Sequence, residues 1–232
     1  MVAGLSAEVS FTEQAWDDIA GWREAVEVMP FIRALSDGTL PADAFAFYLA
    51  QDAAYLTEFS RVLSIASAIA PNAAAQSFYA SSAHVALEVE SALHRDWLAS
   101  QPAVDQEVAP VTVAYTNHLL AAGATGSYAL VVAAVLPCYW LYAHIADVIV
   151  AKAGDLTGHP YARWISTYAD PAFQESARTA CLLADDAAAG VDTATRDRML
   201  TAFARSSTYE YWFFDQAISR PRWPTPPGVA SR

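Results

Sequence analysis

The sequence predicts an all-α protein built as a single helical domain. Three observations indicate this class: apolar residues recur at helical spacing along most of the chain, strand-like alternation is nearly absent, and 55% of the 232 residues are hydrophobic. A chain of this length suits one large domain. The short connections between the expected helices favour an antiparallel bundle over residues 1–220, followed by a proline-rich tail over residues 221–232.

Each expected helix is bounded by residues that start or stop helices. Proline fits the first turn of a helix, so Pro41 and Pro110 mark helix starts, whereas Asp37-Gly38 and Gly123 mark ends. Taken in order, the pattern predicts a helix over 7–28, a turn over 31–35, helices over 41–70 and 72–99, a loop over 103–110, and helices over 110–121, 126–153, 159–169, 171–189 and 192–219.

Charge excludes two classes of partner. The net charge is −12, and the 13 basic residues are scattered along the chain. Nucleic-acid binding needs Lys and Arg clustered on one face, and an anionic membrane surface repels an acidic protein. We therefore expect neither nucleic acid nor membrane as a partner.

Cysteine usage and the N-terminus favour a cytoplasmic protein. Cys138 and Cys181 form no CxxC pair, no signal peptide is recognisable, and Cys181 is expected to pack in the core. The apolar run over 128–150 resembles a membrane span, but it contains Pro137 and Asp147 and is interpreted as a central buried helix.

The stretch Leu136-Pro137-Cys138-Tyr139-Trp140 places a thiol beside a proline inside an apolar helix. Pro137 removes the backbone hydrogen bond to the carbonyl of Ala133, so a kink is expected there. A kink beside Cys138 is where a pocket can open, and Tyr142 follows one turn later on the same face. A thiol with an ordinary pKa of about 8.5 needs a base or a favourable field to react as a thiolate.

Two carboxyl groups fall on helix faces that are otherwise apolar. Asp52 lies one turn after Tyr48 and one turn before Tyr55, and Glu210 lies among the aromatic residues of 209–214. Asp52 is either a structural carboxylate, satisfied by the backbone or an arginine, or an acceptor for an amino-heterocycle stacked on the tyrosines. Glu210 either points to solvent or is desolvated, which raises its pKa toward neutrality. Either carboxylate could accept the thiol proton.

Carboxylate–histidine pairs raise the alternative of a metal site. The pairs at helical spacing are Glu90 with His94, His84 with Glu88, and His144 with Asp147. Di-iron sites in helical bundles use matching Glu-x-x-His elements from two helices. Because that repeated element is absent, no metal is expected.

Several short motifs follow one another in a characteristic order over residues 11–220. They are Pro30-Phe31, Asp37-Gly38-Thr39-Leu40-Pro41, Phe45-x-x-Tyr48-Leu49-x-Gln51-Asp52-x-x-Tyr55-Leu56, Ala92-Leu93-His94-Arg95, Ala114-Tyr115-Thr116, Leu136-Pro137-Cys138-Tyr139-Trp140-x-Tyr142, His159-Pro160-Tyr161-x-x-Trp164-Ile165-x-x-Tyr168 and Tyr209-Glu210-x-x-Phe213. Together they resemble the TenA family of thiaminase II, or aminopyrimidine aminohydrolase, in its cysteine-containing class. The resemblance implies a haem-oxygenase-like helical bundle.

The resemblance implies an enzyme of thiamin salvage. It would hydrolyse 4-amino-5-aminomethyl-2-methylpyrimidine to the hydroxymethyl pyrimidine and ammonia, and cleave thiamin more slowly. Cys138 would be the nucleophile that adds to the ring, and Glu210 would protonate the leaving group and then activate water. Asp52 would bind the ring nitrogen and 4-amino group, and Tyr55 would sit beside the thiol. The tyrosines implied to line the ring are Tyr115, Tyr142 and Tyr168.

The resemblance further implies a cofactor-free homotetramer. The chain departs from the family pattern at Met29, at Ala53-Ala54 and at Phe213-Phe214, and the two alanines are expected to enlarge the pocket. Two alternatives remain: a non-catalytic pyrimidine-binding or regulatory protein, and a cofactor-dependent oxidase similar to pyrroloquinoline quinone synthase. The negative charge disfavours direct DNA contact, and an oxidase site would use His and Arg rather than acidic and tyrosine side chains.

Overall fold

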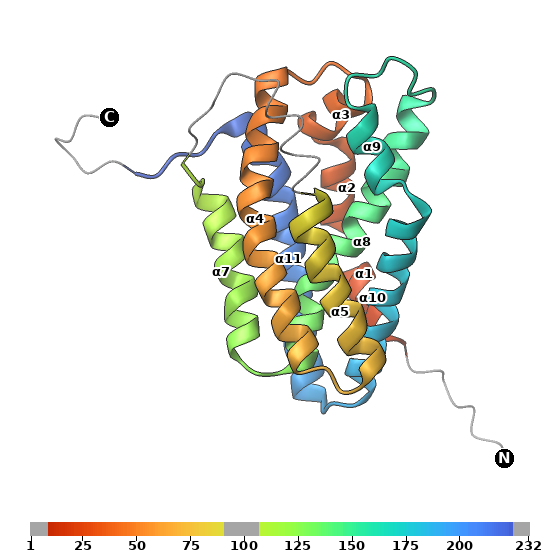
Figure 1. The fold of residues 1–232 in the computed structure, drawn as a ribbon, viewed down its shortest axis with the longest axis vertical. Helices are drawn as coiled ribbons and strands as arrows, with labels where there is room; N and C mark the ends of the chain where they lie inside the picture. The colour runs from red at the N-terminus through yellow and green to blue at the C-terminus, as the bar shows by residue number, and fades with distance from the viewer. Residues whose placement is uncertain (1–8, 91–106, 225–232) are drawn as a thin grey trace.

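The computed structural model describes residues 9–90 and 107–224, and every regular element within these ranges is helical. The elements are α1 (Phe11–Asp18), α2 (Ala20–Val28), α3 (Pro30–Ser36), α4 (Ala42–Ala68), α5 (Ala73–Val85), the π-helix η1 (Ala86–Glu90), α7 (Pro110–Ala124), α8 (Tyr128–Ala153), α9 (Ala162–Tyr168), α10 (Pro171–Ala189) and α11 (Thr193–Ser219). The long helices run side by side along the long axis, with α3 and α9 near one end (Figure 1). The predicted all-α class is confirmed.

The single helix predicted over residues 7–28 is wrong, because two helices occupy this segment. The backbone leaves the helical conformation at Ile19 (φ −101°, ψ 12°), and Gly21, a weak helix former, follows in the first turn of α2. α1 begins at a capping box, in which Ser10 and Glu13 each accept the backbone N–H of the other.

The turn predicted over residues 31–35 is also wrong, because the segment forms α3. Pro30 occupies the first position of this helix, and Met29 before it is extended, as a residue preceding proline prefers. The helix ends at Asp37, as expected. The next residue, Gly38, has φ +76°, and a Cβ added there would lie 3.2 Å from Cδ of Pro160. Both the backbone and the close packing require glycine.

The remaining helices follow the predicted pattern, with three differences in extent. α7 continues to Ala124, so Gly123 lies inside this helix and does not end it as predicted. The regular part of α5 ends at Val85 and continues as η1, so the end of the helix predicted over 72–99 falls outside the described residues. α9 begins at Ala162, whereas the prediction begins at His159, because His159 and Pro160 belong to the turn before the helix.

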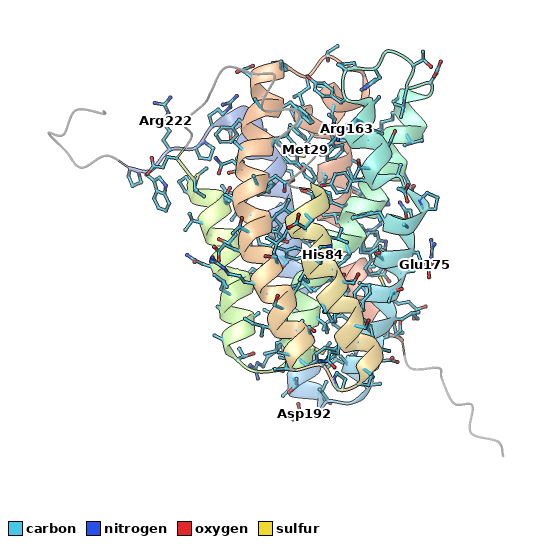
Figure 2. All side chains as sticks on the ribbon, in the orientation of Figure 1. Met29, His84, Arg163, Glu175, Asp192 and Arg222 are labelled. Carbon is cyan, nitrogen blue, oxygen red and sulfur yellow. The ribbon has the colours of Figure 1, made fainter. Side chains whose placement is uncertain are left out.

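Helix α8 is the central element of the bundle. It packs most extensively against α10 and α11, and it continues through Pro137. By length and composition alone, α8 could cross a membrane. However, 83% of its most apolar 18-residue stretch is buried inside the protein, as expected for the core helix that the sequence predicts. Figure 2 shows side chains filling the space between the helices, with the buried Met29 among them and Glu175 and Asp192 on the outside.

We expect Gly38→Ala to lower the free energy of unfolding by about 1–2 kcal/mol, because a residue with a Cβ is strained in the left-handed region. Gly21→Ala is the matched control: a Cβ added there meets nothing within 4 Å, so alanine should stabilise α2 by about 0.5–1 kcal/mol. Urea denaturation measures both variants. Equal effects on the two would contradict the role given to Gly38.

Candidate active site

A cavity of about 140 Å³ lies between α4, α5, α8, α9 and α10. Five of the seven predicted site residues line it, although they come from three helices that are distant in sequence. They are Asp52, Tyr55, Cys138, Tyr142 and Tyr168. The two others, Tyr115 and Glu210, are not among the lining residues.

Helical spacing explains how α4 and α8 present their side chains to this cavity. Asp52, Tyr55 and Phe59 follow one another at i, i+3 and i+7, which places them on one face of α4. Cys138 and Tyr142 stand four residues apart on α8 and line the same space from the opposite side. Asp52 is only 3% exposed, whereas Cys138 is half-buried.

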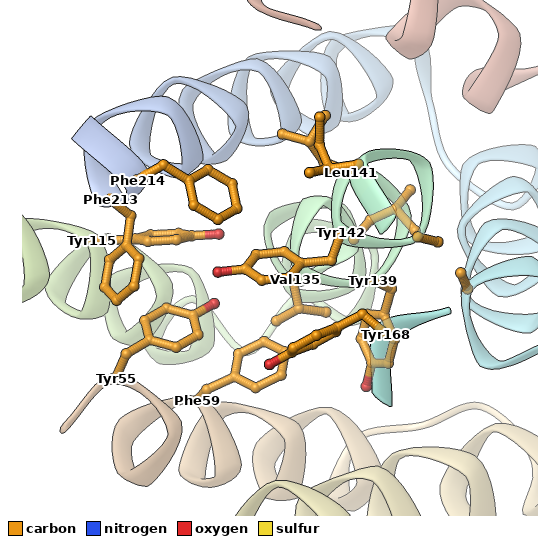
Figure 3. Packing of buried hydrophobic residues seen from close by; sticks show 14 of the residues in the cluster. Tyr55, Phe59, Tyr115, Val135, Tyr139, Leu141, Tyr142, Tyr168, Phe213 and Phe214 are labelled. Carbon is orange, nitrogen blue, oxygen red and sulfur yellow. The ribbon is translucent and has the colours of Figure 1, made fainter. Parts of the chain in front are cut away.

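Glu210 and Tyr115 form a buried pair next to the cavity. The Tyr115 hydroxyl donates a hydrogen bond of 2.6 Å to Oε1 of Glu210, and the carboxyl group is 1% exposed. The Tyr115 ring lies 4.9 Å from the ring of Tyr55, which itself lines the cavity. Figure 3 shows the hydroxyl groups of Tyr55, Tyr115 and Tyr142 pointing toward one central space.

The environment of Glu210 keeps its proton bound at neutral pH. The pKa of this carboxyl group is raised to about 8: burial is the largest cause, the hydrogen bond from Tyr115 opposes the rise, and the nearby charge of Asp52 adds to it. Because Oε1 accepts the Tyr115 bond, the other oxygen of the protonated acid is left to carry the proton. Glu210 can therefore act as a proton donor.

The tyrosines around the cavity remain neutral phenols. Burial is the largest cause that raises the pKa of Tyr55, Tyr115 and Tyr142 well above the usual value. For Tyr55, the interaction with Cys138 is the next cause, so its phenol and the thiol are neighbours. The Tyr142 hydroxyl lies 3.1 Å from the hydroxyl of Tyr48, a residue that was not among the predicted site residues.

The two cysteines have different surroundings. Both are free thiols, but only Cys138 lines the cavity. Cys181 packs against the core, and burial raises the pKa of its thiol to about 12, with a further contribution from Asp185. Cys181 is thus held as a thiol that is poorly suited to react as a thiolate.

Part of the cavity wall was not predicted. Phe78, Ser81 and Ser82 line it from α5, and Phe173 and Ser176 line it from α10. The i, i+3, i+4 spacing on α5 is a signal that these side chains share a face, but spacing does not tell which neighbouring helix they meet.

The structure also bears on the expectations for Ala53-Ala54 and for the carboxylate–histidine pairs. Ala53 and Ala54 are not among the residues that line the cavity, so they do not enlarge it directly. No group of three or more His, Cys, Asp or Glu residues that could hold a metal ion occurs in the described part of the chain. His144 bonds Glu27 instead, at 2.7 Å, and the Glu90–His94 pair lies outside the described side chains.

The fold is that of the haem-oxygenase-like helical bundles. A domain of unknown function with a heme oxygenase-like fold from Shewanella denitrificans aligns with a TM-score of 0.67 at 14% identity, covering 92% of this chain and 94% of that one. The TenA homologue from P. horikoshii OT3 aligns with a TM-score of 0.80 at 25% identity, covering 90% of this chain and 98% of that one. Residues 16–220 match the TENA/THI-4/PQQC family, and the chain belongs to this family, as the sequence motifs predicted.

Two relatives show how much of the chain is shared. The aminopyrimidine aminohydrolase of Bacillus subtilis is 33% identical over 221 residues, which cover 93% of this chain and 92% of that protein. The thiamine biosynthesis multifunctional protein ThiED of Corynebacterium glutamicum is 39% identical over 209 residues, which cover 89% of this chain. The match spans only 27% of the length of ThiED.

The raised pKa of Glu210 predicts a specific pH dependence of stability. Between the unfolded pKa of about 4.3 and the folded pKa of about 8, the folded protein holds a proton that the unfolded chain has released. The protonated Glu210 carboxyl group makes its full contribution to the free energy of unfolding below this pH window. That contribution is lost as pH rises through the window, by at most about 1.4 kcal/mol per pH unit. Glu210→Gln, which cannot ionise, should therefore gain stability relative to the wild type between pH 5 and 8.

Urea denaturation at several pH values measures this difference, with the exposed Glu175→Gln as the control. A constant difference between wild type and Glu210→Gln across the window would mean that the Glu210 carboxyl group is not held protonated by the fold.

Proposed function

We propose that the chain is an aminopyrimidine aminohydrolase, or thiaminase II, of thiamin salvage. Its substrate would be 4-amino-5-aminomethyl-2-methylpyrimidine, which it hydrolyses to the hydroxymethyl pyrimidine and ammonia, and it would cleave thiamin by the same chemistry. The observation that carries this proposal is one aromatic cavity lined by the Cys138 thiol and the Asp52 carboxyl group, with the protonated Glu210 buried next to it. The names and extent of the relatives support it.

Substrate binding would use Asp52 and the tyrosines. A carboxylate can accept N–H bonds from the 4-amino group and from a protonated ring nitrogen, which are charge-assisted and therefore strong. Tyr55 and Tyr142 are neutral phenols that can donate to the remaining ring nitrogen, and Tyr168 adds an aromatic wall. This arrangement fits a flat, amino-substituted heterocycle.

The first half of the reaction would expel ammonia. The Cys138 sulfur bonds to a ring carbon while the thiol proton passes to a ring nitrogen, so the ring loses its aromaticity. Glu210 then protonates the aminomethyl nitrogen. The carbon–nitrogen bond breaks as electrons from the ring nitrogen form an exocyclic double bond, ammonia leaves, and Glu210 remains as a carboxylate.

The second half would add water and restore the enzyme. The Glu210 carboxylate takes a proton from water, and the resulting hydroxide bonds to the exocyclic carbon. The carbon–sulfur bond then breaks, the ring nitrogen returns its proton to Cys138, and the aromatic ring is restored. One water is consumed and one ammonia is released, with Cys138 and Glu210 back in their starting states.

We further propose a cofactor-free homotetramer in the cytoplasm that acts on small pyrimidines rather than on nucleic acid or membranes. Apolar side chains at the surface, such as Leu182, Trp212 and Ile218, provide area that subunit contacts can cover. The net charge of −12 supports the absence of nucleic-acid and anionic-lipid partners.

Ammonia release from the aminomethyl pyrimidine is the direct test of this function. We expect the purified protein to release one ammonia per hydroxymethyl pyrimidine formed, with no added cofactor. Binding of the pyrimidine without turnover would favour a binding or regulatory protein instead. Oxygen uptake with a quinone precursor and no ammonia release would favour an oxidase.

We expect Cys138→Ser to abolish hydrolysis of the aminopyrimidine and of thiamin while leaving the fold intact, because serine is close to cysteine in size but is a much weaker nucleophile. Cys181→Ser is the matched control and should retain nearly full turnover, since Cys181 lies outside the cavity. Steady-state ammonia assays with both variants decide the assignment. Equal loss in the two variants, or no loss in either, would refute it.

We expect Asp52→Asn to weaken binding of the hydroxymethyl pyrimidine roughly 10-fold to 100-fold, because the substitution removes the charge and replaces one of the two accepting oxygens with a donating NH2 group. Thermal stability should change little. Calorimetric titration measures the affinity directly. Unchanged affinity would identify Asp52 as a structural carboxylate.

A further inference from the structure

A cluster of buried polar side chains joins α4, α7 and α11 at the start of α7. Oε1 of Gln51 accepts hydrogen bonds from the backbone N–H of Ala109 (2.8 Å) and from the Thr112 hydroxyl (2.9 Å). Nε2 of Gln216 donates to the same hydroxyl (3.1 Å), and Nε2 of Gln51 donates to the backbone carbonyl of Glu107 (3.2 Å). We call these side chains the Gln51–Thr112–Gln216 cluster.

The Thr112 hydroxyl links α4 to α11 through α7. It donates to Oε1 of Gln51 and accepts from Nε2 of Gln216, and it also lies 3.4 Å from Oε1 of Gln216, a longer contact. All three side chains are at most 1% exposed. Because water cannot replace a lost partner at such a site, displacement of one helix would leave buried polar groups unsatisfied. The cluster therefore favours a single relative placement of the three helices.

Each member of the cluster stands close in sequence to a residue of the candidate active site. On α4, Gln51 immediately precedes Asp52. On α7, Thr112 comes one helical turn before Tyr115. On α11, Gln216 follows Glu210 by less than two turns.

We propose that the Gln51–Thr112–Gln216 cluster holds Tyr115 at hydrogen-bond distance from Glu210, with Thr112 as the positioning residue for the acid of the reaction. Tyr115 and Glu210 come from different helices, and their contact is 2.6 Å long, so a small shift of α7 along α11 breaks it. The catalytic part of this inference rests on the proposed function. The link between the cluster and the Tyr115–Glu210 bond does not.

The titration of Glu210 reports on this link. Of the causes that act on its pKa, only the Tyr115 hydrogen bond lowers it, while burial and the charge of Asp52 raise it. Loss of that hydrogen bond must therefore raise the pKa further. The groups around Glu210 whose ionisation or hydrogen bonding could change at the same time are Asp52 and Tyr55 on α4, Tyr115 on α7, and Cys138 and Tyr142 on α8.

The experiment compares Thr112→Val with Thr116→Val. Both substitutions replace a buried threonine hydroxyl on α7 with a methyl group, but Thr116 bonds only to backbone carbonyls of its own helix. The full-length protein is labelled with ¹³C-glutamate, and the side-chain carboxyl signals are titrated by NMR. Glu210→Gln identifies the signal of interest.

We expect Thr112→Val to raise the titration midpoint of Glu210 by about one pH unit, the effect of losing one hydrogen bond to a charged group. Thr116→Val should leave the midpoint unchanged, and Thr112→Ser, which keeps the hydroxyl, should restore it. An unchanged midpoint in Thr112→Val, or equal shifts in the two valine variants, overturns the proposal. If Thr112→Val does not fold, Gln216→Met, which removes the amide that donates to Thr112, is judged by the same criterion.

Activity provides the second readout. In an enzyme that releases ammonia, Thr112→Val should lower kcat roughly tenfold or more with little change in KM, because the acid is misplaced while ring binding is retained. The alkaline limb of its pH profile should move upward together with the NMR midpoint. If the wild type releases no ammonia, the proposed function fails, and the NMR comparison still decides whether the cluster positions Tyr115.

Discussion

Burial of the Glu210 carboxyl group constrains the arrangement of the whole site. A carboxyl group with 1% exposure in an aromatic interior must either lose its charge or find a strong donor. Here both responses occur, because the acid keeps its proton up to a pKa of about 8 and also accepts a 2.6 Å hydrogen bond from Tyr115. The donor comes from another helix, so α7 and α11 must be held in register for the site to exist.

The carboxyl group of Asp52 has different surroundings from that of Glu210. Asp52 lines the cavity, whereas Glu210 is buried next to it, where it accepts the hydrogen bond from Tyr115. The charge of Asp52 adds to the pKa rise of Glu210, so the proximity of the two groups helps to keep one of them protonated. With Glu210 held protonated beside a second carboxyl group, one small site can contain both an acid and a hydrogen-bond acceptor.

The sequence predicted the class of fold better than it predicted the contacts between helices. Helical periodicity identified Asp52, Cys138 and Glu210 as polar residues on apolar faces, and the motif order identified the family. Periodicity says which face of a helix is buried, but not which helix covers it. For this reason the α5 wall of Phe78 and its neighbours was missed, and so was the bond between Tyr115 and Glu210. The break at Ile19 was missed because local propensity there does not separate one helix from two.

The central position of α8 explains why a thiol in such an apolar helix can meet a polar ligand. A helix that is buried on nearly all sides has little polar surface of its own, so most of the polar groups around Cys138 come from neighbouring helices. Asp52 and Tyr55 come from α4 and Tyr168 from α9, and α8 itself adds Tyr142. The proposed hydrolysis would also consume one water molecule. Ser81 and Ser82 from α5 and Ser176 from α10 are among the polar residues that line the cavity outside α4, and serine hydroxyls can both donate to and accept from a bound water. The same bundle thus buries Glu210 deeply enough for it to hold a proton and places polar side chains on the wall of the neighbouring cavity.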